Sequence, residues 1–209
     1  MKLKLISALA ASLLSAAPVF AETITLDFEG AGPFTFVEGF YNGGVNADGA
    51  SGVNYGISFG PAALAVSNDP AFPIYSNAPT NGTILSATDS DGAMSVAAGF
   101  NGIVSFYYSS EAATTVNIWS GANATGTILA TFALGANAQI GCSDTTFCHW
   151  DLASLDLGSN IARSIQFGDA VGAGFDNITV NAVPVPAAAW LMGSALLGLG
   201  GVARRRAQR

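Results

Sequence analysis

The chain has 209 residues, half of them hydrophobic, and its 14 acidic and seven basic side chains give a formal net charge of −7. Residues 22–182 hold all 14 acidic residues but a single basic one, Arg163. Such an excess of negative charge disfavours binding to nucleic acid or to anionic membranes, so we expect no nucleic-acid partner.

The N-terminus has the pattern of a secretory signal. Lys2 and Lys4 precede an apolar stretch over residues 5–17, Pro18 ends it, and Val19-Phe20-Ala21 forms a cleavage site before Glu22. The apolar stretch is too short to span a bilayer comfortably. We therefore predict a signal peptide at residues 1–21 that signal peptidase removes; the alternative is a buried N-terminal helix.

Residues 22–182 are predicted to form one all-β domain. The stretch is rich in Gly, Ala, Ser, Thr, Val and Phe and poor in the long polar residues that fill exposed helix positions. Alternating polar and apolar residues predict strands over 23–28, 54–59, 102–108, 115–119, 128–132, 164–167 and 175–180. Turn signals such as Asn81-Gly82 and Asn101-Gly102 separate them. This favours an antiparallel β-sandwich of jelly-roll type, in which the first and last strands pair.

The two cysteines, Cys142 and Cys148, are predicted to form a disulfide that stiffens one loop, because an even number of cysteines in an exported protein favours pairing. His149, the only histidine, follows directly and is interpreted as a loop residue. The sequence has no GxSxG or HExxH motif that would assign it a catalytic role.

The C-terminal segment, residues 183–209, is predicted to anchor the chain in the membrane. Residues 187–203 carry no charge and are just long enough to span the hydrocarbon core as a helix. Arg204, Arg205 and Arg206 follow at once and should stop transfer and stay in the cytoplasm. The alternative is a hydrophobic core helix.

A proline motif, an apolar helix and a basic cluster in this order resemble the PEP-CTERM family of sorting signals. The motif Val183-Pro184-Val185-Pro186-Ala187 looks like the VPLPA variant, with Val185 in place of Leu. The resemblance implies a Gram-negative bacterium that makes extracellular polysaccharide, and an exosortase-type protease that cleaves near the proline motif. The precursor would face the periplasm from the inner membrane, and the processed protein would reach the cell surface or the medium.

Two resemblances concern the domain itself. Blocks such as Gly39–Gly44 and Gly174–Thr179 look like a recurring ectodomain type of PEP-CTERM proteins, which implies fold and export but no chemistry. The first and last strands resemble those of calcium-stabilised jelly-roll carbohydrate-binding modules. That resemblance implies a structural calcium site formed by Asp27, Glu29, Asp176 and Asn177; the alternative is a set of turns and solvated carboxylates.

The function favoured by the sequence is that of a non-catalytic surface or matrix protein whose sandwich is a candidate carbohydrate-binding domain. Aromatic side chains that could stack on sugars are Tyr41, Tyr55, Tyr75 and Trp119, although Trp119 lies in an alternating strand and is interpreted as a core residue. The alternative function is an enzyme acting on extracellular polysaccharide, a glycoside hydrolase or lyase, which would need two carboxylates facing each other across a groove.

Overall fold

The structure is a computed structural model that describes residues 22–69, 71, 74–170 and 172–183. The predicted signal peptide and the sorting segment from Pro184 onwards lie outside the described residues. Within them the regular elements are strands and one 3-10 turn: β1 (Glu22–Leu26), β2 (Thr35–Phe36), β3 (Ile57–Phe59), β4 (Ala63–Asn68), β5 (Gly82–Ala87), β6 (Ala93–Ser109), β7 (Thr114–Trp119), β8 (Ile128–Leu134), β9 (Asp151–Asp156), β10 (Ala162–Gln166), η1 (Gly168–Ala170) and β11 (Gly174–Ala182).

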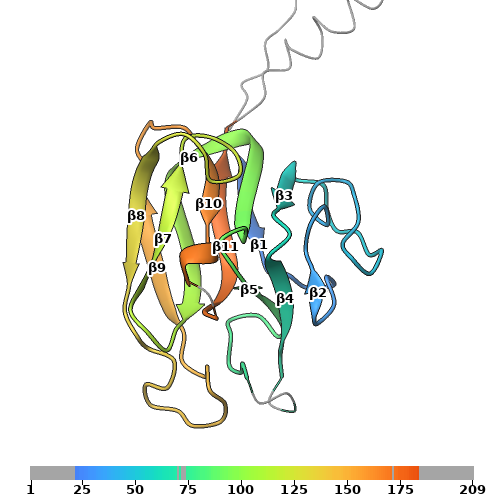
Figure 1. Cartoon of the computed structure of the whole chain (residues 1–209), viewed down its shortest axis with the longest axis vertical. Helices are drawn as coiled ribbons and strands as arrows, with labels where there is room; N and C mark the ends of the chain where they lie inside the picture. The colour runs from blue at the N-terminus through green and yellow to red at the C-terminus, as the bar shows by residue number, and fades with distance from the viewer. Residues whose placement is uncertain (1–21, 70, 72–73, 171, 184–209) are drawn as a thin grey trace, which may run out of the picture. The chain divides into compact units, whose positions relative to one another are not determined.

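The long strand β6 belongs to two layers of the domain (Figure 1). Its first part pairs with β3 and β10, and β10 continues through β7 to β8. Its second part pairs with β9 and β11, and β11 pairs in turn with β1 and β5. Gly99 and Gly102 have φ angles of 79° and 66°, which a residue with a Cβ rarely adopts, and they mark the bend between the two parts.

The two layers pack through the apolar side chains on their facing sides. The Phe106 ring, on the second part of β6, lies 4.7 Å from the ring of Phe132 on β8 and 5.5 Å from that of Phe175 on β11. It also lies 5.9 Å from Phe167, just after β10. Contacts of this kind between strands of different layers confirm the predicted antiparallel β-sandwich.

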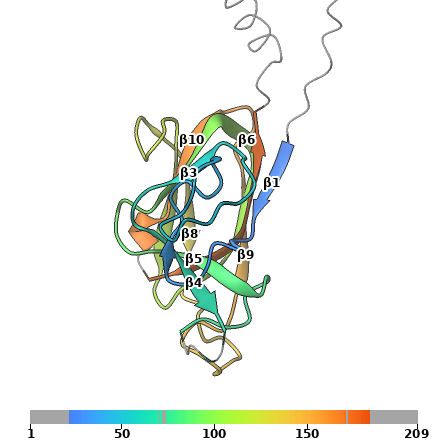
Figure 2. The same ribbon diagram turned by 90° about the vertical axis from the view of Figure 1, so that its right-hand side faces the viewer.

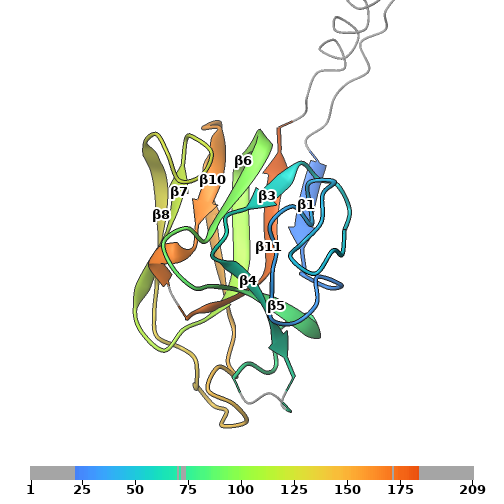
Figure 3. The same ribbon diagram turned by 45° about the vertical axis from the view of Figure 1, so that its right-hand side comes forward.

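The first and last strands are antiparallel neighbours, as the sequence predicts. Their register pairs Glu22 with Ala182 and Leu26 with Ile178. The two ends of the described domain therefore meet at the same end of the second layer. Figure 3 shows β1 and β11 beside one another, with β8, β7, β10 and β6 in order at the other side of the view.

Sequence alternation missed β2, β4, β5, β9 and the first part of β6. Strands β4 and β5 are buried on both sides, so their apolar residues do not alternate with polar ones. In β9 the exposed face includes Leu152, which hides the alternation. The pair Asn101-Gly102, predicted as a turn, lies inside β6, where the glycine accommodates a bulge.

A second, smaller hydrophobic cluster covers the outer side of β4 and β5. It contains the buried residues Val66, Tyr75, Ala78, Ile84, Ala138 and Phe147, with Leu64 and Trp150 against it. The loops that supply its aromatic rings join β4 to β5 and β8 to β9, and the views agree that these loops lie together at the end of the domain away from Glu22 and Ala182 (Figure 2). We call this region the covered end.

Candidate functional site

The predicted acidic cluster is positioned by a sharp change of direction after β1. Phe28 has a φ of 60°, unusual for a bulky residue. Its amide donates to the Tyr41 hydroxyl at 2.9 Å, and its carbonyl accepts from the Thr83 hydroxyl. The turn directs Glu29 toward β5, where its carboxylate accepts from the Thr83 amide at 3.2 Å.

Asp176 is the most constrained carboxylate of the cluster. Its side chain is fully buried, and its two oxygens accept from the amides of Thr80, at 2.9 Å, and Asn177, at 2.7 Å. Asn177 adopts a φ of 49°, which forms a bulge in β11, and its own side-chain oxygen accepts from the Thr80 hydroxyl at 2.8 Å. Asp176 and Asn177 thus fasten the loop before β5 to the last strand.

Burial controls the charge of this cluster. It raises the pKa of Asp176 to about 6, against the effect of the two amides, and the nearby carboxylates of Glu29 and Asp27 raise it further. Burial also raises the pKa of Glu29; the Thr83 amide opposes this, and Asp27 adds to it. The structure therefore brings Asp27, Glu29 and Asp176 into one electrostatic environment, which disfavours the ionised forms of Asp176 and Glu29.

The residues do not form an obvious metal cage. Within residues 22–69, 71, 74–170 and 172–183 no group of three or more His, Cys, Asp and Glu side chains is placed to hold a metal ion. The oxygens of Asp176 already accept from backbone amides, and that of Asn177 accepts from a hydroxyl. Calcium binding by Asp27, Glu29, Asp176 and Asn177 stays a prediction.

The disulfide between Cys142 and Cys148 is present, with Cα atoms 6.0 Å apart, which confirms the predicted pairing. It closes the loop that carries Phe147 into the covered end. The Phe147 ring stacks on Tyr75 at 4.6 Å, and the Tyr75 hydroxyl donates to the Gly172 carbonyl. The bridge therefore braces the cover over β4 and β5, in agreement with its predicted structural role.

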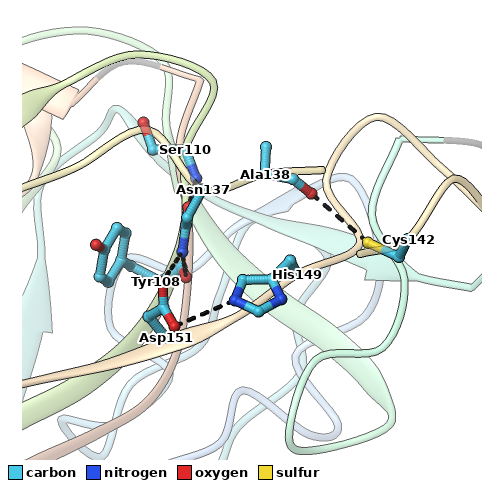
Figure 4. Close-up of polar contacts among 7 residues, drawn as sticks. All are labelled: Tyr108, Ser110, Asn137, Ala138, Cys142, His149 and Asp151. Atoms are coloured by element: carbon cyan, nitrogen blue, oxygen red, sulfur yellow. Dashed lines mark hydrogen bonds and ion pairs between the residues drawn. The ribbon is translucent and has the colours of Figure 1, made fainter. Parts of the chain in front are cut away.

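His149 belongs to a polar network beside the disulfide (Figure 4). Its Nε2 lies 3.1 Å from Asp151 Oδ1, and the other oxygen of Asp151 accepts from the buried Asn137 amide at 3.0 Å. The Asn137 amide oxygen accepts from the Ser110 backbone, whereas the Ser110 hydroxyl donates to the Ala112 carbonyl. The network ties the loop to β6 and does not direct a serine hydroxyl at the imidazole.

The four aromatic residues proposed from the sequence differ in how far the structure buries them. Tyr41 and Tyr75 are buried, so they do not serve as sugar platforms. Tyr55 is half-buried against Tyr41, with ring centroids 6.2 Å apart. Trp119 lies on the outer side of its layer and not in the core, because Val116 and Ile118 face inward and Trp119 is the next residue in the alternation. Its indole N–H donates to Gln166 at 3.1 Å.

The outer side of the second layer carries a different surface, which the sequence analysis missed. Tyr107 is half-buried there, between the inward-facing Phe106 and Tyr108. Register pairs it with Leu152 on β9 and with Asp176 on β11. The exposed and half-buried side chains that continue this surface toward Glu22 and Ala182 define what we call the open face: Tyr107, Leu152, Ser105, Ser154, Thr179, Thr25, Ile103, Asp156, Asn181 and Thr23.

Direct hydrogen bonds hold several of these polar side chains in place. The hydroxyls of Thr25 and Thr179 lie 2.9 Å apart, and Thr23 donates to Asn181 at 2.7 Å. The Asn181 amide donates in turn to the Ile103 carbonyl at 3.0 Å.

The run Phe106-Tyr107-Tyr108 gives no period-2 contrast, so sequence alone could not assign its middle ring to the outside.

A hollow of about 660 Å³ lies beside the acidic cluster and not on the open face. It is lined by Glu29, Gly30, Gly32, Pro33, Ser67, Asn68, Asp69, Asn81, Gly82 and Thr83. Glu29 and Asp69 both line this hollow, and a polysaccharide hydrolase would require two carboxyl groups on either side of the scissile bond.

No protein-family model matches the sequence, and comparison with curated proteins finds no match. Solved structures with some likeness include a family 29 carbohydrate-binding module from Piromyces equi, 11% identical over 78% of this chain and 91% of that one, with a TM-score of 0.40. A module of Cellvibrio mixtus lichenase 5A, in complex with cellotriose, is 11% identical over 59% and 89%, with a TM-score of 0.35.

A family 43 arabinoxylan arabinofuranohydrolase from Bacillus subtilis, in complex with cellotetraose, is 14% identical over 68% of this chain and 31% of its own, with a TM-score of 0.37. At these values of identity and TM-score the likenesses assign neither a family nor a ligand to this chain.

Proposed function

We propose that the chain is an exported, jelly-roll-like β-sandwich that binds polysaccharide without catalysis, through the open face. The observation that carries the proposal is the half-buried ring of Tyr107 on an otherwise uncovered sheet, next to a field of uncharged hydrogen-bonding side chains. An aromatic ring offers a flat apolar surface for a sugar ring, and fixed hydroxyls and amides supply orientation.

The apolar part of the open face supports this function. Leu152, which is 57% exposed, pairs with Tyr107, and Ile103, which is 55% exposed, lies on the far side of the Ser105–Ser154 pair. Large side chains exposed together on one face of a soluble domain mark a binding surface more often than single exposed residues do. Mixed apolar and hydroxyl groups match the two kinds of surface that a sugar chain presents.

The outer side of the first layer is less suited to this role. The loop after β7 folds back over it, where Asn123 bonds with Ser95 and the Ala124 amide donates to Ser164. The Trp119 N–H is already committed to Gln166. We therefore assign binding to Tyr107 and use Trp119 as the matched aromatic control.

The test is a glycan array probed with the full-length protein, kept soluble by a detergent that has no sugar headgroup. We expect binding to at least one polysaccharide, lost in Tyr107→Ala and retained in Tyr107→Phe and Trp119→Ala. Loss of binding in Trp119→Ala with retention in Tyr107→Ala would move the site to the other layer. Absence of binding to every glycan would reject the function.

We further propose that the chain is exported and sorted through residues 183–209. The support is the order of the proline motif, the apolar stretch and Arg204–Arg206 in the sequence. The apolar stretch lies outside the described residues; among those that are described, no helix is long and apolar enough to cross a membrane. If Arg204, Arg205 and Arg206 are replaced by Gln, cell fractionation should show disturbed retention and processing; unchanged retention and processing would reject the sorting segment.

A polysaccharide-cleaving enzyme is the second candidate, and the hollow shared by Glu29 and Asp69 is the observation that favours it. Burial raises the pKa of Glu29, which is the property required of a general acid. Release of reducing sugar from the glycans bound in the array, abolished in Glu29→Gln, would support the enzyme. Stable glycans would support a binding domain.

A further inference from the structure

The open face is almost free of charge, although the domain around it is strongly acidic. Of its ten side chains only Asp156 carries a carboxyl group, and it lies at the edge, on β9. Arg163, the single cation between residues 22 and 182, is on β10 in the other layer, and its guanidinium donates to the Ala97 carbonyl. A ligand on the open face therefore meets no positive charge there.

The polar groups of the open face have the chemistry to bind hydroxyls. The Thr179 hydroxyl donates to the Asn177 carbonyl at 3.3 Å and lies 2.9 Å from the Thr25 hydroxyl, so the pair uses both of its O–H groups and offers a ligand hydroxyl the lone pairs of its oxygens. Ser105 and Ser154 stand in register with Thr179, which extends this row across β9, β6, β11 and β1. Recognition of a carboxylate or sulfate would instead use Arg, Lys or a set of converging amides.

The side chains of the open face are arranged in two rows that run across the strands. Tyr107 and Leu152 form one row, and Ser154, Ser105, Thr179 and Thr25 form the next, both running across the strands. Four strands spaced about 4.8 Å apart give the second row a length of about 14 Å. That is long enough to contact more than one sugar ring of an extended chain.

From these observations we propose that the ligand is an uncharged polysaccharide, which stacks one ring on Tyr107 and lies across β9, β6, β11 and β1. This inference rests on the proposed function and adds the class of glycan. Polysaccharides rich in uronate or sulfate are excluded, because the carboxylates of the domain repel their negative charges. At moderate ionic strength this repulsion acts over a Debye length of about 10 Å.

The experiment compares matched pairs of polysaccharides on the full-length protein in a detergent without a sugar headgroup. Each backbone is used unmodified, hydroxyethylated and carboxymethylated to the same degree, so that added bulk is separated from added charge. Affinity electrophoresis at low salt should show binding to at least one unmodified backbone, weakened at least tenfold by carboxymethyl groups and much less by hydroxyethyl groups. Added salt should recover part of the loss.

The outcomes separate the two proposals. Equal or tighter binding of a carboxymethylated form, abolished in Tyr107→Ala, would overturn the uncharged ligand and leave the binding function intact. An equal loss with hydroxyethyl groups would also overturn it, because bulk and not charge would be responsible. Failure of every form of every backbone to bind would overturn the proposed function itself.

Discussion

The covered end and the open face are two parts of the same outer sheet surface, and they are built in opposite ways. At the covered end small residues lie under large rings: a Cβ at Gly174 would be 2.7 Å from Tyr75 and 2.8 Å from Trp150. On the open face the large residue, Tyr107, stands only two positions along β6 from Ser109, which pairs with Gly174. Its ring is left partly exposed.

The difference shows that the chain can cover this sheet and does so at only one end. The cover uses a disulfide, the stacked rings of Tyr75 and Phe147, and an indole N–H bond from Trp150 to the Ser76 carbonyl. Full burial of one large apolar side chain contributes about 1.5–3 kcal/mol. Leu152 and Ile103 forgo that contribution and stay exposed on the face that we propose for binding.

The largest expected effect comes from removing a ring of the cover. Phe147→Ala should lower the free energy of unfolding by about 3–4 kcal/mol, because it leaves a cavity beside Tyr75 and loses their stacking. Tyr107→Ala, in contrast, should change it by less than about 1 kcal/mol. Chemical denaturation measures both values. Similar losses for the two variants would contradict the contrast between the covered end and the open face.

Asp176 links the two regions and should make stability depend on pH. Its carboxyl has a raised pKa of about 6 in the folded protein, so the native state binds an extra proton between about pH 4 and 6. Stability should therefore fall, by at most about 3 kcal/mol, as the pH rises through this window. With a chelator present, Asp176→Asn should remove this loss of stability from the pH profile. An unchanged profile would show that other carboxyl groups cause the loss.

The same measurement tests the calcium prediction. If Asp27, Glu29, Asp176 and Asn177 bind calcium, the ion should raise the melting temperature at pH 7 and abolish the loss of stability between pH 4 and 6. Asp176→Asn should not respond to calcium. Magnesium at equal ionic strength controls for general screening, and an equal response to both ions would reject a specific site.

A smaller effect is expected from the disulfide. Replacing Cys142 and Cys148 by Ser should cost about 2 kcal/mol, as expected for closing so short a loop. The loss should be confined to the covered end, so hydrogen exchange should speed up over residues 138–148 while glycan binding through Tyr107 persists. Loss of binding together with the disulfide would show that the two regions are not independent.

The smallest effect concerns the close packing at Gly174. Gly174→Ala should destabilise the domain by about 1–2 kcal/mol, because Tyr75 and Trp150 must shift to admit the methyl group. Gly135→Ala is the matched control, since a Cβ at Gly135 has no atom within 4 Å. Equal melting temperatures for the two variants would mean that the rings of the cover are loosely packed.

Sequence reasoning succeeded where side-chain pattern and local chemistry agree. It predicted the sandwich, the pairing of the first and last strands and the disulfide, because alternation and cysteine spacing are local signals. It also placed Asp27, Glu29 and Asp176 in one region through that pairing. It failed for β4 and β5, whose burial on both sides depends on loops far away in the sequence.

The open face shows why the candidate site could not be predicted in the same way. Its residues come from β1, β6, β9 and β11, none of which follows another directly in the sequence, and β9 was missed altogether. Trp119 was wrongly placed in the core: alternation from Val116 and Ile118 puts its side chain on the outer side together with Asn117, so the error lay in assigning a large ring to the core against that pattern. Tyr41 and Tyr75 looked equally available, although both are needed for packing.

The most direct test of the account is to map the contact of a bound glycan by NMR, using a polysaccharide fragment selected by the array. The amide signals of Ser105, Tyr107, Ser154 and Thr179 should shift together on titration, while those of residues 120–127 and 138–148 stay in place. Shifts centred on Trp119 and Gln166, or on the hollow between Glu29 and Asp69, would contradict the assignment of the open face as the binding surface.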